Sequence, residues 1–335
     1  MSLSNLTYDE IDHFVGRFRL DATGGSDERI VKKQVRKPKK SKQEIVVELS
    51  AASDASSAPG ELRMTYHPAR YETVWLGDSL RPFYEQGLID DVLMLVKGGK
   101  EANVYLCQGT AAANNALLAA KVYRPRQFRN LRNDKMYREG REMLNSLGGT
   151  IKSRDNREMR AIGKKTDFGM ELTHISWLMH EFVTLQRLHE LGAAAPRAVA
   201  SGENAILMGY VGDRSRPAPV LHAVTLNRQE AQKHFTEVMR NIELMLTHGM
   251  IHGDLSAYNI LYWQGRVTLI DFPQVTFAEA NTNAYKILER DIQRVCDYFT
   301  RYDIHSNPVA LAERMWKQYV RLPPGGLAAM LLPEE

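Results

Sequence analysis

Short apolar runs separated by polar clusters mark the region between about residues 75 and 125. The runs VLMLV, NVYLC and ALLAAKVY are divided by Gly, Asn and Thr, which is the punctuation typical of strands and turns. A short helix is expected before them, at residues 80–86. The pattern therefore predicts a helix followed by three antiparallel strands.

Farther along the chain, apolar residues recur at helical spacing in three long segments. In HISWLMHEFVTLQRLHELG we expect Thr173 to be the N-cap and Gly192 to end the helix. A second helix ends at Gly249, and a third runs through NAYKILERDIQRVCDYFTRY. AILMGYVGD is typical of a buried strand, and NILYW and RVTLID flank Gln264 and Gly265, a pair suited to a two-residue hairpin turn. An α+β fold follows, with a small β-rich lobe before an α-rich lobe.

The amino-acid composition indicates where the domains and tails of the chain begin and end. The chain has 335 residues and is 44% hydrophobic, enough for two lobes and a sizeable core. A basic run at 29–42 precedes a stretch rich in Ser, Ala and Pro, so the start is expected to be a mobile tail. The expected organisation is a tail at 1–60, a main domain at 61–305 whose first lobe ends near 208, a mobile basic insertion at 124–172, and a C-terminal extension at 306–335.

Charge and cysteine usage limit the classes of partner and site. No segment approaches the roughly 18 uninterrupted apolar residues of a membrane helix, so we expect a soluble, cytoplasmic protein without membrane contact. The two basic clusters, at 29–42 and 124–165, favour either solvated arms or an electrostatic contact with RNA or another polyanion. Cys107 and Cys296 lack nearby ligand partners, which indicates small core residues rather than zinc ligands or a disulfide.

The stretch IHGDLSAYNILYWQGRVTLID carries the candidate chemistry. It fits H-x-D-x-x-x-x-N with a later Asp, an arrangement that phosphoryl transfer requires. Asp254 would orient the attacking hydroxyl and receive its proton, and Asn259 and Asp271 would hold magnesium on the phosphates of ATP. The hairpin brings Asn259 and Asp271 together at its open end. When the motif is taken alone, a polar loop between two strands is an alternative explanation of the pattern.

Upstream residues supply the partners that such a site needs. Lys121, on an expected strand, is placed to hold the α- and β-phosphates, and Glu181, on the following helix, to orient that lysine. In KGGKEANVY, Gly98 and Gly99 let the backbone approach phosphate and Lys100 adds charge. Each is ordinary when taken singly, as a strand lysine, an exposed helix carboxylate and a hairpin turn. Their order together with the loop favours a nucleotide site.

The segment LMGYVG completes the expected site as an edge whose backbone pairs with adenine between the lobes, unless it is only a core strand ending in a Gly loop. The predicted nucleotide-binding residues are Gly98, Gly99, Lys100, Val104, Lys121, Glu181, Met208, Gly209 and Val211. The predicted catalytic residues are Asp254, Asp271 and Lys121, and the predicted ligands of Mg²⁺, or of Mn²⁺ in its place, are Asn259 and Asp271.

Five segments, GGKEANVYL, AAKVYR, LMGYVG, IHGDLSAYNIL and IDFPQ, resemble in order and context the RIO-type atypical serine/threonine protein kinases, over about residues 75–300. The resemblance implies a trimmed kinase fold that binds ATP and Mg²⁺ and phosphorylates serine, often its own, or hydrolyses ATP through a phospho-aspartate. It implies that Asp254 is the catalytic acceptor and that Asp271 is both metal ligand and the site of a transient aspartyl phosphate. The family's ribosome-linked roles make a ribosomal particle a candidate partner of the basic clusters.

The sequence departs from kinase patterns at several positions. The phosphate turn lacks the full G-x-G-x-x-G, and Ala257 stands where relatives often carry an acidic residue. Gly253 replaces the arginine that in ordinary kinases pairs with a phosphorylated activation loop, and no A-P-E stretch follows DFPQ. Control by an activation loop is therefore not expected.

Two other classes of function remain open on the sequence. Small-molecule phosphotransferases share the H-x-D-x-x-x-x-N loop and the later Asp, but they usually carry an acidic C-terminal region for cationic substrates, whereas RLPPGGLAAMLLPEE is short and apolar. A catalytically weak scaffold would bind RNA or ribosomal particles through the basic clusters. The presence of all the catalytic residue types argues against that scaffold.

Overall fold

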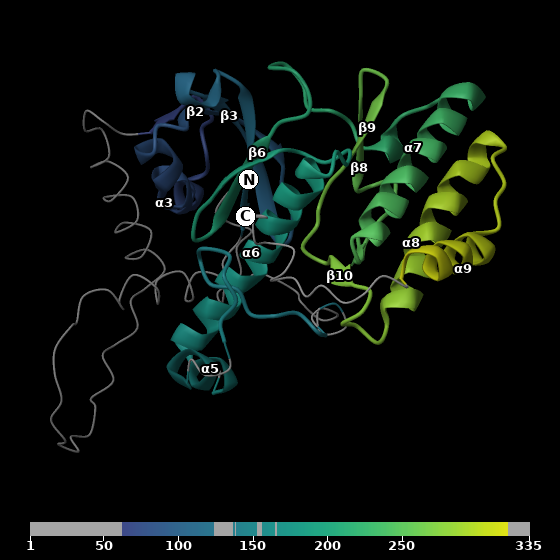
Figure 1. The fold of residues 1–335 in the computed structure, drawn as a ribbon. Helices are drawn as coiled ribbons and strands as arrows, with labels where there is room; N and C mark the ends of the chain where they lie inside the picture. Colours follow the sequence, from purple (N-terminus) through teal and green to yellow (C-terminus); the bar gives the residue numbers. More distant parts are fainter. Residues whose placement is uncertain (1–61, 124–136, 138, 153–155, 165, 321–335) are drawn as a thin grey trace, which may run out of the picture.

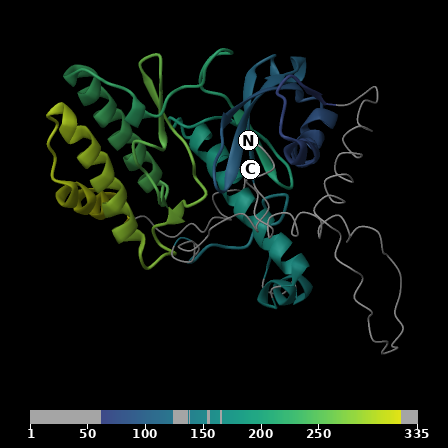
Figure 2. The same cartoon turned by 180° about the vertical axis from the view of Figure 1, so that it is seen from behind.

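The chain folds into two lobes, a sheet-containing lobe and a mostly helical lobe, which confirms the α+β, kinase-like architecture (Figure 1). The computed structural model describes residues 62–123, 137, 139–152, 156–164 and 166–320. The expected tail at 1–60, its basic run, and residues 124–136 of the insertion lie outside these residues. Seen from behind, helix α3 (Arg70–Glu85) and helix α9 (Pro308–Tyr319) lie at opposite ends of the molecule (Figure 2).

A six-stranded sheet forms the first lobe. Its spatial order is β1 (Arg63–Met64), β2 (Ile89–Lys97), β3 (Ala102–Gly109), β4 (Leu117–Tyr123), β6 (Ala205–Gly209) and β5 (Ala198–Ser201). The three strands expected from the apolar runs are β2, β3 and β4, and they pair antiparallel as predicted. The sequence pattern did not reveal β1, which pairs parallel to β2, or β5, which pairs with β6.

Helix α3 is much longer than the helix expected at residues 80–86. It contains Pro82 in its last turn and glycine in its middle, both of which lower helix propensity. Leu80 and Phe83 are nevertheless fully buried in an apolar cluster with the sheet. Tertiary burial therefore outweighs the weak local preference that shortened the prediction.

Helix α6 (Asp167–Glu190) begins earlier than expected, so the prediction of Thr173 as its N-cap was wrong. Thr166 is the cap, because its hydroxyl oxygen accepts a hydrogen bond of 3.1 Å from the backbone N–H of Gly169. Thr173 lies inside the helix, where its hydroxyl donates to the Gly169 carbonyl at 2.8 Å. The predicted end was right, since Gly192 follows the helix with φ of +73°. A short helix, α5 (Asn156–Gly163), packs against α6.

The second lobe is built on helices α7 (Arg228–Thr247), α8 (Ala284–Phe299) and α9, with α9 packed against the other two. The predicted hairpin is present as β8 (Ile260–Trp263) and β9 (Arg266–Leu269). Its turn residues Gln264 and Gly265 both have positive φ, 47° and 75°, as a tight two-residue turn of this kind requires. The short strand β7 (Met250–Ile251) pairs with β10 (Thr276–Phe277) and joins the ends of the region between them.

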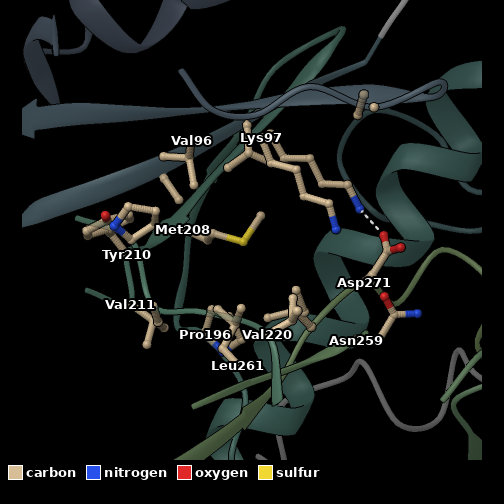
Figure 3. A pocket seen from close by; sticks show the side chains of 18 of the residues that line it. Val96, Lys97, Pro196, Met208, Tyr210, Val211, Val220, Asn259, Leu261 and Asp271 are labelled. Carbon is tan, nitrogen blue, oxygen red and sulfur yellow. Dashed lines mark hydrogen bonds and ion pairs between the residues drawn. The ribbon is translucent and has the colours of Figure 1, made fainter. Parts of the chain in front are cut away.

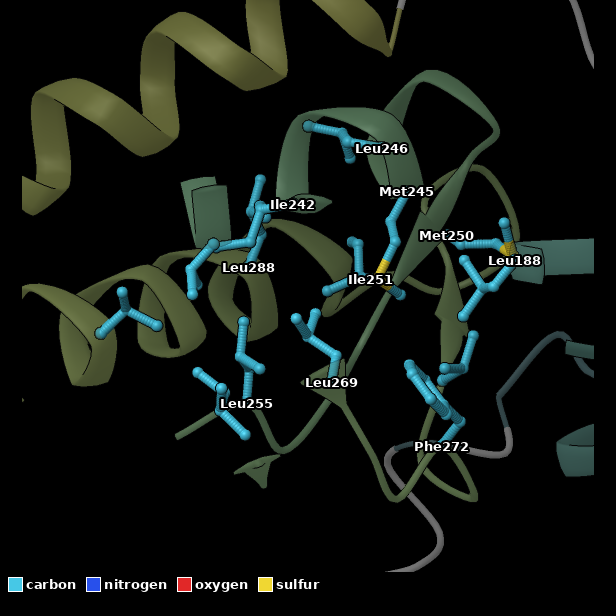
Figure 4. Close-up of a cluster of buried hydrophobic side chains, with 14 of the residues drawn as sticks. Leu188, Ile242, Met245, Leu246, Met250, Ile251, Leu255, Leu269, Phe272 and Leu288 are labelled. Carbon is cyan, nitrogen blue, oxygen red and sulfur yellow. The ribbon is translucent and has the colours of Figure 1, made fainter. Parts of the chain in front are cut away.

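The core of the second lobe anchors the candidate catalytic loops directly. Leu255 follows Asp254, Phe272 follows Asp271, and both apolar side chains are at most 1% exposed. Figure 4 shows them among Ile251, Leu269 and Leu288 in one cluster. Each carboxylate is thus adjacent to a side chain whose removal from the core would cost about 2–5 kcal/mol.

Two smaller expectations can also be compared with the structure. Cys107 and Cys296 are free and buried, as predicted for small core residues. In the part of the chain that the structure describes, no helix combines the length and the apolar character needed to cross a membrane.

Candidate nucleotide-binding and phosphoryl-transfer site

A cavity of about 610 Å³ lies between the sheet and the β8–β9 hairpin, within the size range of small-molecule sites. Figure 3 shows its two ends. Apolar side chains gather at one end, namely Val96, Pro196, Val211, Val220 and Leu261, with Tyr210 beside them. Lys97, Asn259 and Asp271 lie toward the other end, and Met208 projects between the two. The cavity therefore offers an apolar part suited to a base and a charged part suited to phosphates.

Most of the predicted site residues line this cavity. They are Gly99, Lys100, Val104, Lys121, Glu181, Met208, Gly209, Val211, Asn259 and Asp271. Gly98 and Asp254 are not among the lining residues. Gly98 is exposed and precedes Gly99 in the turn. Asp254 contacts the lining residue Asn259, whose side-chain amide donates to the Asp254 backbone carbonyl at 2.8 Å.

Lys121 joins the two lobes through two short ion pairs. Its Nζ lies 2.6 Å from Glu181 Oε1 and 2.6 Å from Asp271 Oδ1. Burial by itself would lower the pKa of the Lys121 ammonium, but the charges of Asp271 and Glu181 outweigh burial and raise this pKa well above its ordinary value. The lysine is therefore charged and held between Glu181 on α6 and Asp271 at the end of the β8–β9 hairpin.

Glu181 is held on its other oxygen by Tyr123, a residue that the sequence reasoning did not single out. The Tyr123 hydroxyl donates to Glu181 Oε2, and the Glu181 side chain is 1% exposed. Burial and the neighbouring Glu181 charge raise the pKa of Tyr123, so the hydroxyl keeps its proton to donate. Lys121 and Tyr123 are two positions apart on β4, which places both side chains on one face of the sheet. This two-residue spacing is visible in the sequence and could have identified Tyr123 as a neighbour of Lys121.

Asp271 occupies an unusual backbone conformation at the end of the hairpin. Its φ is +72°, in the left-handed region that few residues other than glycine adopt, and its side chain remains 43% exposed. Burial in the cleft favours the protonated acid, but the charge and hydrogen bond of Lys121 prevail, with smaller help from His252 and Lys97, and lower the pKa of Asp271. Asp271 is thus an ionised carboxylate with one oxygen on Lys121, and its other oxygen has no hydrogen-bond partner among the described residues.

Asp254 is engaged by two other residues. Its Oδ1 lies 2.7 Å from Nη1 of Arg294, on α8, and its Oδ2 accepts a hydrogen bond of 3.3 Å from the Asn259 amide. Because the amide nitrogen of Asn259 is turned to Asp254, its carbonyl oxygen is turned toward Asp271 (Figure 3). Arg294 carries no signal in the sequence, since it lies 40 positions beyond Asp254.

The loop around Asp254 is supported by buried polar contacts. The ring of His252 is 3% exposed and its Nε2 lies 3.1 Å from the carbonyl oxygen of Ile270. The backbone N–H of Gly253 donates to buried Asp291 at 2.8 Å, and Arg290 donates to the Gly253 carbonyl. Burial raises the pKa of Asp291, against the opposing charges of His252 and Arg290.

Gly253 has a steric reason to be glycine. Its φ is +85°, and a Cβ built there would lie 2.2 Å from the carbonyl oxygen of Gln274. An arginine at this position, as in ordinary kinases, would collide with the loop that follows Asp271. The departure noted in the sequence is therefore a consequence of how closely the two loops pack.

Residues 139–152 of the basic insertion contact the second lobe. The guanidinium of Arg141 donates to the carbonyl of Pro273 at 2.9 Å and also to that of Val275. Glu139 accepts a hydrogen bond of 2.9 Å from the Thr282 hydroxyl. The segment therefore holds the loop after Asp271 in the region where an activation loop would otherwise lie.

The donor set fits a magnesium ion that is shared with a phosphate ligand. Among the described residues, no group of three or more His, Cys, Asp or Glu side chains is placed to hold a metal. Asn259 and Asp271 present oxygen atoms alone, and Mg²⁺ prefers oxygen ligands and commonly takes one or two carboxylates together with substrate phosphates and water. These two residues suit that mode of binding and not an all-protein cage.

Comparison with known proteins gives a consistent result. A family model described as the RIO domain matches residues 103–311. Over 234 residues the chain is 29% identical to the RIO-type serine/threonine-protein kinase Rio1 of Haloferax volcanii, covering 68% of this chain and 70% of that one. It is 26% identical over 220 residues to the human serine/threonine-protein kinase RIO1, covering 65% of this chain but 35% of the longer human protein.

The fold has a counterpart among solved structures. The crystal structure of the Rio2 kinase–ADP/Mg²⁺–phosphoaspartate complex from Chaetomium thermophilum matches with a TM-score of 0.55 and 17% sequence identity. The match covers 98% of this chain and 91% of that chain. At this level of identity the likeness supports the kinase fold, including the separation into a sheet lobe and a helical lobe.

Proposed function

The chain belongs to the RIO kinase family, and we propose on that premise that it transfers the γ-phosphoryl group of ATP to serine or threonine, including its own residues. The observation that carries the proposal is the pair of 2.6 Å contacts from Lys121 to Glu181 and Asp271 at the charged end of the cavity. A kinase needs a lysine so oriented beside a metal-binding carboxylate. The relatives' names support serine/threonine kinase activity at the level of the family.

The place of each residue in or beside the cavity indicates its proposed role in binding ATP or in transferring the phosphoryl group. The apolar end, with Met208 and Val211, would bind the base, and Lys121 would bind the phosphates. Asn259 and Asp271 would hold Mg²⁺, which when bound neutralises charge on the phosphates. Asp254 would accept the proton of the acceptor hydroxyl while the oxygen of that hydroxyl forms a bond to the γ-phosphorus. The bond between the γ-phosphorus and the β–γ bridging oxygen breaks, and ADP leaves.

A second route, ATP hydrolysis through an aspartyl phosphate, is favoured by the state of Asp271. This carboxylate is ionised, is 43% exposed, and has one oxygen that is not engaged by Lys121. That oxygen would attack the γ-phosphorus, release ADP, and form an acyl phosphate that water then cleaves to inorganic phosphate. The structurally similar Rio2 complex contains ADP, Mg²⁺ and phosphoaspartate.

The basic clusters suggest a polyanionic partner for this activity. We propose that the runs at 29–42 and 124–165 contact RNA or a ribosomal particle in the cytoplasm, in line with a role in ribosome maturation. Such binding should weaken steeply as salt rises, because counterions are released from the nucleic acid. Filter binding of the full chain to RNA at increasing salt tests this part, and salt-independent or absent binding contradicts it.

The catalytic proposal is tested by incubating the full chain with Mg²⁺ and γ-labelled ATP. Label on the protein and free phosphate are followed for the wild type, Asp254→Ala and Asp271→Asn. Serine- or threonine-linked label that is lost in both variants supports the kinase route. Free phosphate with a hydroxylamine-sensitive label, lost in Asp271→Asn, supports the aspartyl-phosphate route. A wild type that yields neither label nor free phosphate would overturn both routes.

A further inference from the structure

A second lysine faces the same end of the cavity as Lys121. In the sheet, Val104 on β3 pairs with Lys97 on β2 and with Lys121 on β4. Directly opposed residues of antiparallel strands point to the same face, so both lysines flank Val104 on the face that covers the cavity. All three residues line it.

The two lysines differ in what they contact. Lys121 is 11% exposed in its side chain and bridges two carboxylates. Lys97 is exposed, and its ammonium forms no hydrogen bond or ion pair with any residue that the structure describes. Its charge is nevertheless close enough to Asp271 to contribute to the lowered pKa of that carboxyl group. Figure 3 shows its side chain extending beneath the sheet into the cavity.

The net charge of the groups at this end of the cavity indicates that a phosphate bound there needs a further cation such as Lys97. Lys121 carries one positive charge, and Glu181 and Asp271 carry two negative charges, so this triad has a net charge of −1 without Lys97. A terminal phosphate brought beside Asp271 would be repelled by this triad, and the Mg²⁺ that Asn259 and Asp271 would hold offsets only part of the negative charge of a nucleoside triphosphate. The turn after β2 lacks the full set of glycines that would surround that phosphate with backbone N–H groups.

We propose that Lys97 binds the terminal phosphate of the nucleotide and thereby selects a triphosphate over a diphosphate. This inference rests on the proposed function, because it assumes that ATP occupies the cavity. Lys97 suits the task because it is the last residue of β2, so its backbone is fixed by the sheet while its side chain is exposed. Lys121 would contact the phosphates common to ATP and ADP, and Lys97 the one that distinguishes them.

The test compares affinities for a non-hydrolysable ATP analogue and for ADP, each with Mg²⁺, by calorimetric titration of the full chain. Lys97→Met keeps the length of the side chain and removes its charge. We expect it to weaken binding of the ATP analogue about tenfold and that of ADP less than about twofold, as befits loss of one charge-assisted contact. Lys97→Arg should restore most of the preference.

Lys286→Met is the matched control, because Lys286 is also an exposed lysine but lies on α8 and does not line the cavity. It should leave the ratio of the two affinities within about twofold of the wild type. An equal loss for both nucleotides in Lys97→Met, or an equally large change of the ratio in Lys286→Met, would overturn the inference and leave the proposed function standing. A wild type that binds neither nucleotide would instead contradict the proposed function itself.

Discussion

The floor and the roof of the cavity are built in different ways. The floor, residues 252–274, has its polar groups fixed by the protein: Asp254 by Arg294, Asp271 by Lys121, and the backbone of Gly253 by Asp291. None of the residues of the roof turn, 98–101, is buried, and the contact from the Gly99 N–H to the Asn103 side chain measures 3.3 Å.

This difference indicates where the site is preorganised and where it awaits a ligand. Groups that are aligned before the substrate binds need not be reorganised during reaction, which is the main source of electrostatic catalysis. An exposed glycine turn has few contacts to hold it, so it can adjust when phosphate arrives. Substitutions in the floor should therefore affect turnover and stability, whereas substitutions in the roof should affect nucleotide affinity.

The largest effect is expected for Asp271→Asn, which removes the negative charge that pairs with Lys121 and that the proposed Mg²⁺ would need. Turnover of ATP should fall about a thousandfold or more, measured as label transfer and phosphate release. Asp303→Asn is a suitable control, because Asp303 also has a positive φ, 59°, but lies on the surface after α8. A variant of Asp271 that retains turnover within tenfold would remove this carboxylate from the mechanism.

Gly253→Ala should be the most destabilising change in the floor. The added Cβ would lie 2.2 Å from the Gln274 carbonyl oxygen at a φ of +85°, so the two loops must separate. We expect a loss of about 3 kcal/mol in the free energy of unfolding, measured in urea. Gly265→Ala isolates the backbone effect, since its φ is +75° but nothing lies within 4 Å of the added Cβ. That control should lose only about 1 kcal/mol, and equal losses would show that the close packing at Gly253 is unimportant.

The free energy of unfolding should depend on pH through His180. This residue is 6% exposed, and its Nε2 lies 2.6 Å from the Glu142 carbonyl oxygen. Burial and the charge of Arg141 lower the pKa of His180 to about 4. The unfolded chain therefore takes up this proton first as pH falls, near the ordinary value of about 6.5. The stabilisation is complete above that pH and is lost progressively as pH falls from about 6.5 to about 4.

The expected loss of unfolding free energy from His180 is about 1.6 kcal/mol between pH 6.5 and pH 5. Urea unfolding at a series of pH values measures it. His180→Gln retains an N–H donor for Glu142 without a titrating group, so its stability should fall less over the same interval. Parallel pH profiles for the two proteins would contradict the assignment.

The smallest effect is expected in the roof. In Gly99→Ala the new Cβ would lie 2.6 Å from the Ala102 carbonyl oxygen, whereas in Gly98→Ala the nearest contact is an ordinary 3.8 Å to the Asn103 side chain. Gly99→Ala should therefore lower nucleotide affinity about tenfold and Gly98→Ala less than about twofold. Neither should shift the urea midpoint as far as Gly253→Ala does, because no residue of the turn is buried. A loss of affinity in Gly98→Ala as large as in Gly99→Ala would contradict this reading of the turn.

Much of the candidate site could be proposed from the sequence because its residues lie in short, strongly patterned segments. The hairpin after Asn259 and the strand around Lys121 were both read from alternation and turn residues, and the structure brings these residues to one cavity. The start of α6 was misplaced at Thr173 because the apolar spacing is weak before that residue. Arg294 was missed because its contact with Asp254 crosses from a helix that carries no motif of its own.

The sequence by itself determined the order of strands and helices, the family resemblance and the chemical groups available at the site, since these depend on local spacing and residue type. Only the tertiary structure decided which groups meet. It set Lys97 beside Val104 through strand register, turned Asn259 toward Asp271, and packed Gly253 against the loop after Asp271. Contacts of this kind depend on how distant segments are buried against one another, which no local pattern encodes.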